Sequence, residues 1–439
     1  MSRLRFCMVT TFYPPYNFGG DGTGIQRLSH GLVKRGHEVT VVHDADAYMT
    51  LAGGPEPTPV PHPPGLRVIT LRTRLGALST LLTQQTGRPV MNGRRLRALL
   101  APGRFDVINF HNVSLVGGPG VLGYGDAVKL YMAHEHWLVC PSHVLWRHNR
   151  ERCDGRQCLR CVLHYHRPPQ LWRYTGTLER SLRHIDAFIA MSEFSRDKHR
   201  EFGFTRDMEV VPYFLPDLDP VQDGEGTGTE SPHPRPYFLF VGRLEVIKGL
   251  DDVIPVFRNY PQADLLIAGD GEHAGPLKGK ASGMGNVHFL GRVSPDALRR
   301  YYRHTLALIV PSVCFETFGI ILIEAFREGT PVIARRLGPF PEILDKAGAG
   351  LLFDDERELL DGMSALQRDP ARRRDWSEQA RTAFTRHWSE SAVLPRYLDV
   401  VRAAAERSGR GKVAAALESS TDADLTAGGA GSARRSPRS

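Results

Sequence analysis

The chain opens with Arg5-Phe-Cys-Met-Val-Thr10, an apolar run of the kind that forms a buried strand. A helical pattern follows over residues 25–35, Gly36 closes it, and Glu38-Val-Thr-Val-Val-His43 gives a second strand pattern. This strand–helix–strand order predicts a parallel, doubly wound α/β sheet. Further strand patterns lie at residues 66–71, 107–110, 129–133, 187–190 and 209–211, and helical patterns include residues 171–183 and 249–258.

The alternation stops in a stretch rich in Pro, Gly and acidic residues, and it restarts at residue 237. Such a stretch has little to bury and is typical of a linker. We therefore expect two doubly wound domains with a cleft between them. The predicted segments are an N-terminal domain (1–215), a linker (216–236), a C-terminal domain (237–388), a C-terminal helix that packs back on the N-terminal domain (389–407) and a disordered tail (408–439).

Composition narrows the class of protein. A chain of 439 residues is long enough for two cores, and it holds no apolar stretch of the length that spans a membrane. The first ten residues lack the apolar core of a signal peptide, so we expect a cytoplasmic protein. Residues 1–215 hold 27 Lys and Arg against 17 Asp and Glu, a basic excess compatible with a solvated surface, anionic substrates or peripheral contact with the inner face of a membrane. Nucleic-acid-binding motifs do not accompany the charge, so a nucleic-acid partner is not expected.

Two glutamates mark the candidate site. In Pro311-Ser-Val-Cys-Phe-Glu316-Thr-Phe-Gly319-Ile-Ile-Leu-Ile-Glu324, an apolar strand ends, a short loop carries Glu316, and a helix begins near Gly319. The amides of the loop suit a phosphate, since the helix dipole and unpaired N–H groups favour an anion. Glu324 lies within an apolar helix, where a carboxylate is costly unless it binds something. The alternative is that Glu324 lies on a solvated stripe of the helix.

Two cations follow an earlier strand. In Val241-Gly-Arg243-Leu-Glu-Val-Ile-Lys248-Gly249 they stand five residues apart on a loop leading into a helix. Such a pair can bind a diphosphate and neutralise the charge that builds on a leaving group. Each cation in isolation is equally compatible with an ordinary exposed surface.

Together these motifs resemble the family 4 retaining glycosyltransferases, which have the GT-B fold of two Rossmann-like domains facing across a cleft. Ala268-Gly-Asp-Gly271 belongs to the same resemblance, and Leu290-Gly291-Arg292-Val293 is similar to the family's Leu-Gly-X-Val loop. The N-terminal pattern from Tyr13-Pro14-Pro15 to Val39 is similar too, and the ordered set covers about residues 5 to 400. The resemblance implies transfer of a sugar from a nucleotide-diphosphate sugar to a hydroxyl acceptor.

The resemblance also implies roles for individual residues. Arg243 and Lys248 are expected to hold the donor diphosphate, Glu316 the transferred sugar and Glu324 the ribose. Backbone groups around Arg292 and Val293 are expected to contact the base, and the amides of Phe318 and Gly319 a phosphate. Gly20 is expected to let the N-terminal loop approach the diphosphate. These donor-binding positions are Arg292, Val293, Thr317, Phe318, Gly319 and Gly20.

In Ala133-His134-Glu135-His136, the resemblance places His134 near the reacting carbon. His136 competes for that role, and a hydrogen-bonded core histidine is the alternative for either. One departure concerns the loop Gly338-Pro-Phe-Pro341-Glu342, where the family often has two glycines before Pro-Glu. Pro339 removes one amide donor from a loop that usually touches the sugar.

The implied mechanism is front-face displacement with retained configuration, which requires no metal cofactor. Electrostatic stabilisation of the leaving diphosphate is then the main catalytic task. The acceptor stays open between a lipid-linked molecule, a polysaccharide and a small-molecule glycoside, as in cell-envelope or polysaccharide biosynthesis. Two alternatives share the fold, namely a nucleotide-sugar 2-epimerase and a nucleotide-sugar-binding protein without activity.

Four cysteines, Cys140, Cys153, Cys158 and Cys161, lie within an Arg- and His-rich insertion at residues 140–166. Four thiolates can hold a structural zinc ion and stabilise an insertion that has little core. Reduced, partly buried thiols are the alternative in a reducing compartment. Histidines that can replace one ligand are His143, His148, His164 and His166.

Overall fold

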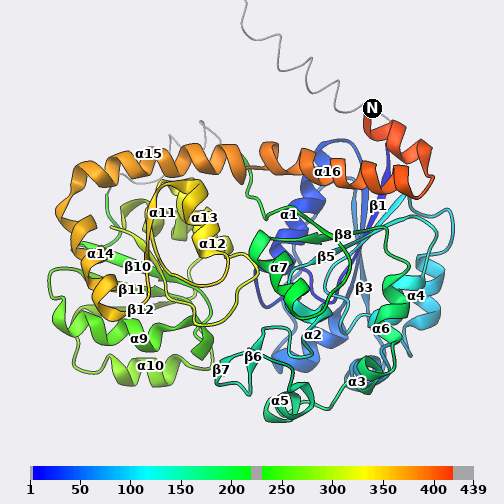
Figure 1. Ribbon diagram of the computed structural model, residues 1–439, viewed down its shortest axis with the longest axis horizontal. Coiled ribbons are helices and arrows are strands. Elements are labelled where there is room, and N and C mark those ends of the chain that lie inside the picture. Colours follow the sequence, from blue (N-terminus) through cyan, green and yellow to red (C-terminus); the bar gives the residue numbers. More distant parts are fainter. Residues whose placement is uncertain (1–2, 219–229, 419–439) are drawn as a thin grey trace, which may run out of the picture.

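The computed structural model describes residues 3–218 and 230–418. It contains two parallel sheets, of seven and six strands, and helices lie on both faces of each (Figure 1). The predicted class, two doubly wound α/β domains in series, is thereby confirmed.

The first sheet has the strand order β3-β2-β1-β4-β5-β8-β9, and its strands pair in parallel. Its central strands are buried on both faces, which explains why their sequences read as continuous apolar runs. The bounds are β1 Arg5–Val9, β2 Glu38–Asp44, β3 Leu66–Leu71, β4 Val107–Phe110, β5 Val128–Ala133, β8 Ala187–Ala190 and β9 Met208–Val210.

The second sheet has the order β12-β11-β10-β13-β14-β15, again parallel. In both sheets the chain runs outward from a central strand in one direction and then returns to extend the sheet in the other. The point of reversal is where open α/β sheets bind ligands. The bounds are β10 Tyr237–Val241, β11 Asp264–Ala268, β12 Val287–Gly291, β13 Leu308–Val310, β14 Val332–Arg335 and β15 Gly350–Phe353.

The helices of the N-terminal domain are α1 Gly20–Lys34, α2 Ala45–Ala52, α3 Gly76–Thr86, α4 Gly93–Leu99, α5 Cys158–His164, α6 Thr177–Leu182 and α7 Glu193–Glu201. The helical pattern over residues 171–183 divides into a 3-10 turn, η3 Leu171–Tyr174, and α6. Gly176 separates them because its backbone is left-handed, with φ of 65°. The insertion also carries a short antiparallel pair, β6 Trp146–Arg147 and β7 Glu151–Arg152.

The helices of the C-terminal domain are α9 Leu250–Val253, α10 Ala274–Lys280, α11 Pro295–His304, α12 Ile320–Glu328, α13 Phe340–Ala347 and α14 Glu356–Arg368. The helix expected from Gly249 to Arg258 is α9 followed by a 3-10 segment, η5 Ile254–Asn259. Pro255 accounts for the change, since it lacks the N–H that an α-helix needs there.

Two long helices, α15 Pro370–His387 and α16 Glu390–Arg407, run end to end across both domains (Figure 1). α16 packs on β5, β8 and α1 of the N-terminal domain, where Asn109 Nδ2 donates to the Tyr397 hydroxyl over 3.1 Å. Disorder was expected from residue 408 onward, but residues 411–418 form a helix that buries Val413 and Leu417. Residues 419–439 of that predicted tail, and residues 219–229 of the predicted linker, lie outside the described residues. Within the described part of the chain, no helix combines the length and apolarity needed to span a membrane.

Candidate active site

Glycines bring the loops after three strands of the second sheet into direct backbone contact. A Cβ at Gly269, after β11, would lie 1.8 Å from the carbonyl oxygen of Gly242, after β10. A Cβ at Gly249 would lie 2.1 Å from the carbonyl oxygen of Pro311, after β13. Gly249 also has φ of 74°, so larger residues are excluded by space and by conformation. This packing sets the Arg243–Lys248 loop beside the loop that carries Glu316.

Lys248 and Glu316 form an ion pair, with Nζ 2.5 Å from Oε1. The Ser312 hydroxyl donates to the same carboxylate oxygen over 3.1 Å. Burial is the largest single effect on the pKa of Lys248 and works to lower it, but the charge of Glu316 and its hydrogen bond with Lys248 are among the effects that together leave the pKa above its ordinary value. Burial works to raise the pKa of Glu316, and Lys248 outweighs that effect in the same way. Both groups are therefore charged at neutral pH.

Arg243 stands at the edge of this pair. Its guanidinium forms an ion pair with Glu245, and about half of its side chain is exposed. Its charge acts on both Lys248 and Glu316. The structure thus gathers three of the predicted catalytic residues, with two cations around one carboxylate.

Glu324, on α12, contacts both domains. The Tyr302 hydroxyl donates to its Oε2 over 3.2 Å, and Arg27 of α1 lies 3.5 Å from its Oε1. Burial raises the pKa of Glu324, and Arg27 partly offsets this effect. Neither Arg27 nor Tyr302 was predicted: Tyr302 stands in no motif, and Arg27 lies within the N-terminal pattern but was not singled out for the site.

The loop Thr317-Phe318-Gly319 also touches the N-terminal domain. The Thr317 hydroxyl donates to the carbonyl oxygen of His134 over 2.8 Å, and the Ser192 hydroxyl donates to the carbonyl oxygen of Thr317 over 2.7 Å. Phe318 is buried against the ring of Tyr213. At the start of α12, Gly319 has φ of 105°, and a Cβ there would lie 2.8 Å from the ring of Phe340. The loop is therefore held in one conformation at the interface of the domains.

The remaining donor-binding candidates lie in two places. Gly20 begins α1, and a Cβ on it would lie 2.7 Å from Cδ1 of Ile320, so the N-terminal loop meets the start of α12. Val293 is half-buried after β12. Arg292 is exposed, with its guanidinium 3.9 Å from Asp270 of the neighbouring loop. No contact joins Arg292 to the Lys248–Glu316 pair among the described residues.

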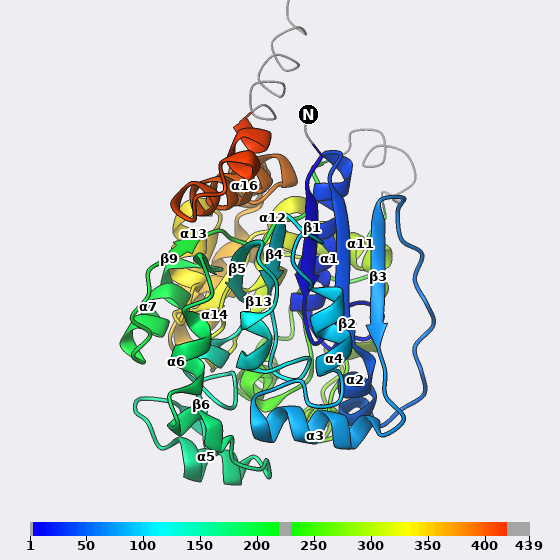
Figure 2. The same cartoon turned by 90° about the vertical axis from the view of Figure 1, so that its right-hand side faces the viewer.

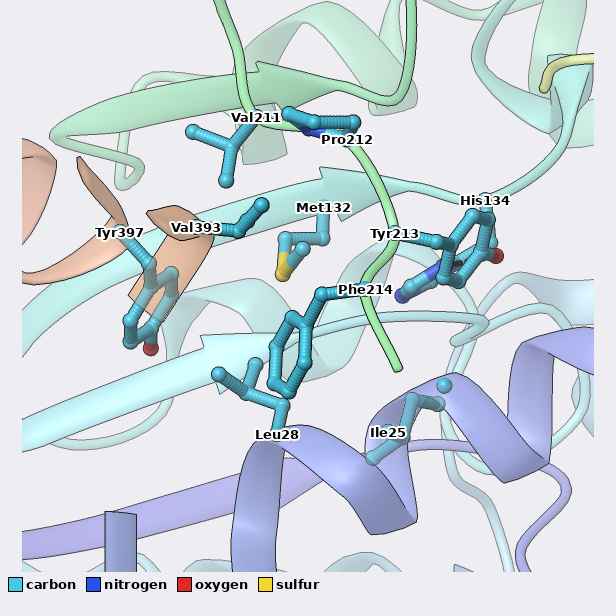
Figure 3. A pocket seen from close by; sticks show the side chains of 11 residues that line it. Ile25, Leu28, Met132, His134, Val211, Pro212, Tyr213, Phe214, Val393 and Tyr397 are labelled. Atoms are coloured by element: carbon cyan, nitrogen blue, oxygen red, sulfur yellow. Dashed lines mark hydrogen bonds between the residues drawn. The ribbon is translucent and has the colours of Figure 1, made fainter. Parts of the chain in front are cut away.

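His134 is buried, and both of its ring nitrogens have partners. Nδ1 lies 2.5 Å from the hydroxyl of Tyr213, which lines the same cavity (Figure 3), and Nε2 lies 2.8 Å from Nδ1 of His111. Burial lowers the pKa of His134 to about 3, so the ring is neutral. The cavity beside it has a volume of about 20 Å³ and mostly apolar walls, enough for one water molecule but not for a sugar. His136 is buried next to the ring of His199, and it contributes no exposed group.

One carboxylate of the N-terminal domain, Asp21, lies within electrostatic reach of Arg243, and a second, Glu135, lies within reach of Asp21; the sequence did not single out either for the site. Burial, and then the charge of Glu135, raise the pKa of Asp21 to about 6, while the charge of Arg243 works against this rise. Glu135 lies 2.8 Å from Nδ1 of His143, within the cysteine-rich insertion. Asp21 and Glu135 are half-buried, so they can offer acceptors to sugar hydroxyls.

Another contact between the domains comes from Glu342, in the loop that departs from the family pattern. Its carboxylate accepts from the N–H groups of Glu193 and Phe194, at 3.1 and 2.9 Å. These amides begin α7, where a negative charge is favoured by the helix dipole. Gly338, with φ of 65°, turns this loop beside the backbone of Glu316.

The four cysteines are free thiols, of which Cys140 and Cys161 are buried. Each thiol is close enough to influence the others electrostatically, and Cys161 Sγ accepts from the N–H of His148 over 3.3 Å. Their sulfur atoms do not gather as closely as those of a metal site. Within the described ranges, the group with ligand atoms all within 4.8 Å of one another is His233, Asp264 and His288.

Comparisons with known proteins agree with this geometry. Residues 18–215 match the family model described as Glycosyltransferase Family 4, and residues 227–383 match the model described as Glycosyl transferases group 1. A D-inositol 3-phosphate glycosyltransferase of Xylanimonas cellulosilytica is 28% identical over 417 residues, which cover 89% of this chain and 93% of that protein.

Two solved structures share the fold. Sucrose-phosphate synthase from Thermosynechococcus elongatus is similar with a TM-score of 0.66, 19% identity and coverage of 91% of this chain and 98% of that one. The Anabaena protein HepE, solved in complex with UDP-glucose, has a TM-score of 0.63, 15% identity and coverage of 91% and 100%. The predicted GT-B fold and family resemblance are confirmed. The chain belongs to the family 4 glycosyltransferases, a retaining family, and it transfers a sugar from a nucleotide-sugar donor.

Proposed function

We propose that this enzyme takes its sugar from a UDP-sugar and transfers it to a hydroxyl group by front-face displacement, without a metal ion in the reaction. The observation that carries the proposal is the Lys248–Glu316 pair beside Arg243, at the strand ends of the second sheet. The UDP-glucose complex of HepE, which has the same fold, supports the choice of UDP. Family 4 enzymes typically work without a metal ion.

In this mechanism the side chains exchange partners when the donor binds. Lys248 turns from Glu316 to the diphosphate, where Arg243 joins it, and Glu316 is left to accept from a hydroxyl of the sugar. Glu324 likewise exchanges Arg27 for the ribose hydroxyls and keeps its bond from Tyr302. The first-turn amides of α12 face a phosphate, where the helix dipole adds to the attraction.

The chemical step breaks the bond between the anomeric carbon and the diphosphate oxygen, and that oxygen keeps the electron pair. The acceptor oxygen bonds to the anomeric carbon on the same face, and its proton passes to the leaving phosphate. Arg243 and Lys248 stabilise the charge that develops on the diphosphate, so they act mainly in the transition state. Asp21 and Glu135 orient hydroxyl groups from the N-terminal side.

We assign His134 a positioning role through its backbone. Its carbonyl oxygen holds Thr317 in the donor loop, while both ring nitrogens stay within the N-terminal domain. A direct contact between the ring and the sugar requires the Tyr213 hydrogen bond to open. Tyr213→Phe removes that bond, so a rise in the donor KM would favour the indirect role, and an unchanged KM would favour direct contact.

The test incubates the protein with a panel of UDP-sugars and other nucleotide sugars, with and without candidate acceptors. We expect UDP to be released in the presence of an acceptor, and we expect Glu316→Ala and Arg243→Ala to reduce the rate at least 100-fold. The matched control is Arg357→Ala, since Arg357 is a fully solvated arginine of α14, with 90% of its side chain exposed. An epimerised donor formed without an acceptor would favour the epimerase instead. Donor binding without turnover would favour the inactive binding protein.

We also propose that the cysteine-rich insertion holds a structural zinc ion on Cys140, Cys153, Cys158 and Cys161, whose binding draws together sulfur atoms that lie farther apart in this structure than in a metal site. Arg147, Arg156 and Arg173 each act electrostatically on one or two of these thiols, which suits the net negative charge of a zinc ion with four thiolates. Elemental analysis should find one zinc per chain, lost in Cys158→Ser/Cys161→Ser. The control is His233→Ala/His288→Ala, and zinc lost from that variant instead would place the ion at the histidine site.

A further inference from the structure

Helix α3 has its apolar and polar faces reversed. It buries Ser79, Thr80 and Thr83, and it exposes Leu78 and Leu81, with 44% and 46% of their surface accessible. A helix on the surface of a globular domain normally turns its apolar stripe inward. Within the described part of the chain, no contact therefore accounts for the exposure of apolar side chains at Leu78 and Leu81 of α3.

Two neighbouring segments continue this exposed apolar surface. On α5, Leu159 and Leu163 stand four residues apart and are 50% and 56% exposed. On η3, Leu171 and Tyr174 stand three residues apart and are each 64% exposed. Both spacings place the pair on one face of its segment.

These segments lie along one edge of the N-terminal domain. Gln84 at the end of α3 donates to the carbonyl oxygen of Pro168, and the Trp172 indole of η3 donates to the carbonyl oxygen of Gln84, each over 2.9 Å. Both views show α3 and α5 at the same lower edge (Figures 1 and 2). We name this surface the apolar edge; its members are Leu75, Leu78, Leu81, Val90, Met91, Leu159, Leu163, Leu171 and Tyr174.

The two stretches of sequence that carry the apolar edge are basic, although the exposed acids Asp154 and Glu179 stand at the borders of the second stretch. Residues 57–105 contain eight arginines and no Asp or Glu, and residues 155–178 contain four arginines and again no Asp or Glu. Exposed arginines in these two stretches include Arg74, Arg88, Arg94, Arg95, Arg97, Arg160 and Arg167. Exposed leucines among arginines are typical of helices that lie in the interface of an anionic bilayer.

We propose that the apolar edge docks the enzyme on the surface of an anionic membrane. The leucines of α3 and α5 enter the boundary between headgroups and acyl chains, and the arginines pair with lipid phosphates. The insertion that carries α5 also reaches the active site, because Cys153 packs in one cluster with Phe315, the neighbour of Glu316. Resting on the proposed function, this placement favours a lipid-linked acceptor, whose headgroup enters the cleft from the bilayer.

The test is co-sedimentation of the full chain with vesicles of phosphatidylcholine alone or with about one third phosphatidylglycerol. We expect binding to the anionic vesicles only, and weaker binding as salt increases. Leu78→Ser/Leu81→Ser should weaken it at least tenfold, and Leu159→Ser/Leu163→Ser should have the same effect. Arg88→Gln/Arg94→Gln/Arg95→Gln should weaken it about 100-fold, from about fivefold for each arginine near an anionic surface.

Matched controls separate this proposal from the enzymatic one. Val60→Ser and Arg357→Gln alter an exposed apolar side chain and an exposed arginine elsewhere, and they should bind vesicles as the wild type does. The serine variants should keep the wild-type thermal shift with UDP, which shows that they fold and that the donor site is intact. Three results would overturn the proposed docking surface. They are equal binding to neutral and anionic vesicles, no binding to either kind of vesicle, and full binding by both serine variants. Vesicle binding without any UDP response would leave the docking surface standing and overturn the proposed donor.

Discussion

Replacing Lys248 by methionine is the sharpest perturbation of the site. Methionine keeps most of the length and apolar stem of lysine but removes its charge, so Glu316 loses its ion-pair partner and keeps the bond from Ser312. The leaving diphosphate loses one of its two expected cations. Stability and catalysis should therefore both fall, for different reasons.

The two losses have different magnitudes. Leaving one partner of a fully buried ion pair unpaired costs about 3–5 kcal/mol. Here the two side chains keep 21% and 22% exposure, which lowers the cost to about 2 kcal/mol. Removing one charge aimed at a leaving group typically lowers kcat about 100- to 1000-fold.

A double variant separates these effects. Lys248→Met/Glu316→Gln carries no charge at either position, so it should regain most of the lost stability in urea unfolding. It should regain none of the lost kcat, measured by UDP release under saturating donor. A kcat within threefold of the wild type for Lys248→Met would refute the role of Lys248 at the diphosphate.

Three further predictions concern single residues. Glu324→Gln keeps the bond from Tyr302 but loses the ribose carboxylate, so we expect the donor KM to rise about tenfold with kcat changed less than threefold; an unchanged KM would contradict the ribose contact. Burial raises the pKa of Asp44 to about 7, so the protonated form is favoured in the folded state, and its stability contribution is complete below pH 4 and lost as the pH rises through 7. Asp44→Asn should therefore flatten the fall in unfolding free energy between pH 5 and pH 8.5, and a parallel fall in both proteins would count against it. Glu342→Gln should weaken the contact with α7 and increase the radius of gyration of the donor-free protein in small-angle X-ray scattering, whereas an unchanged radius would show that the contact does not hold the domains together.

The sequence predicts the fold well because both sheets are parallel and buried on both faces. Their strands appear as continuous apolar runs, and a glycine with a left-handed backbone, such as Gly36, marks the end of a helix. Errors occur where local detail decides the structure, as at Gly176 and Pro255, and at residues 411–418, whose burial depends on packing against distant parts of the chain.

The candidate site is predictable only in part for a similar reason. Motifs place Lys248 and Glu316 on loops at strand ends, and the structure brings them together. Arg27, Asp21 and Glu135 reach the site from the other domain. They lie within the N-terminal patterns, but the sequence alone does not associate Arg27 with Glu324 or Asp21 with Arg243.

The central claim is tested most directly by following the turnover of a UDP-sugar with ¹H NMR. The anomeric configuration of the product is recorded before the product sugar can mutarotate. From an α-linked UDP-sugar, a retaining transfer through the Arg243–Lys248 site predicts that the first product is α-linked, whether the acceptor is a sugar hydroxyl or water. It also predicts that Arg243→Ala/Lys248→Met forms no product in the same time. A β-linked first product, or undiminished turnover by that variant, would contradict the account.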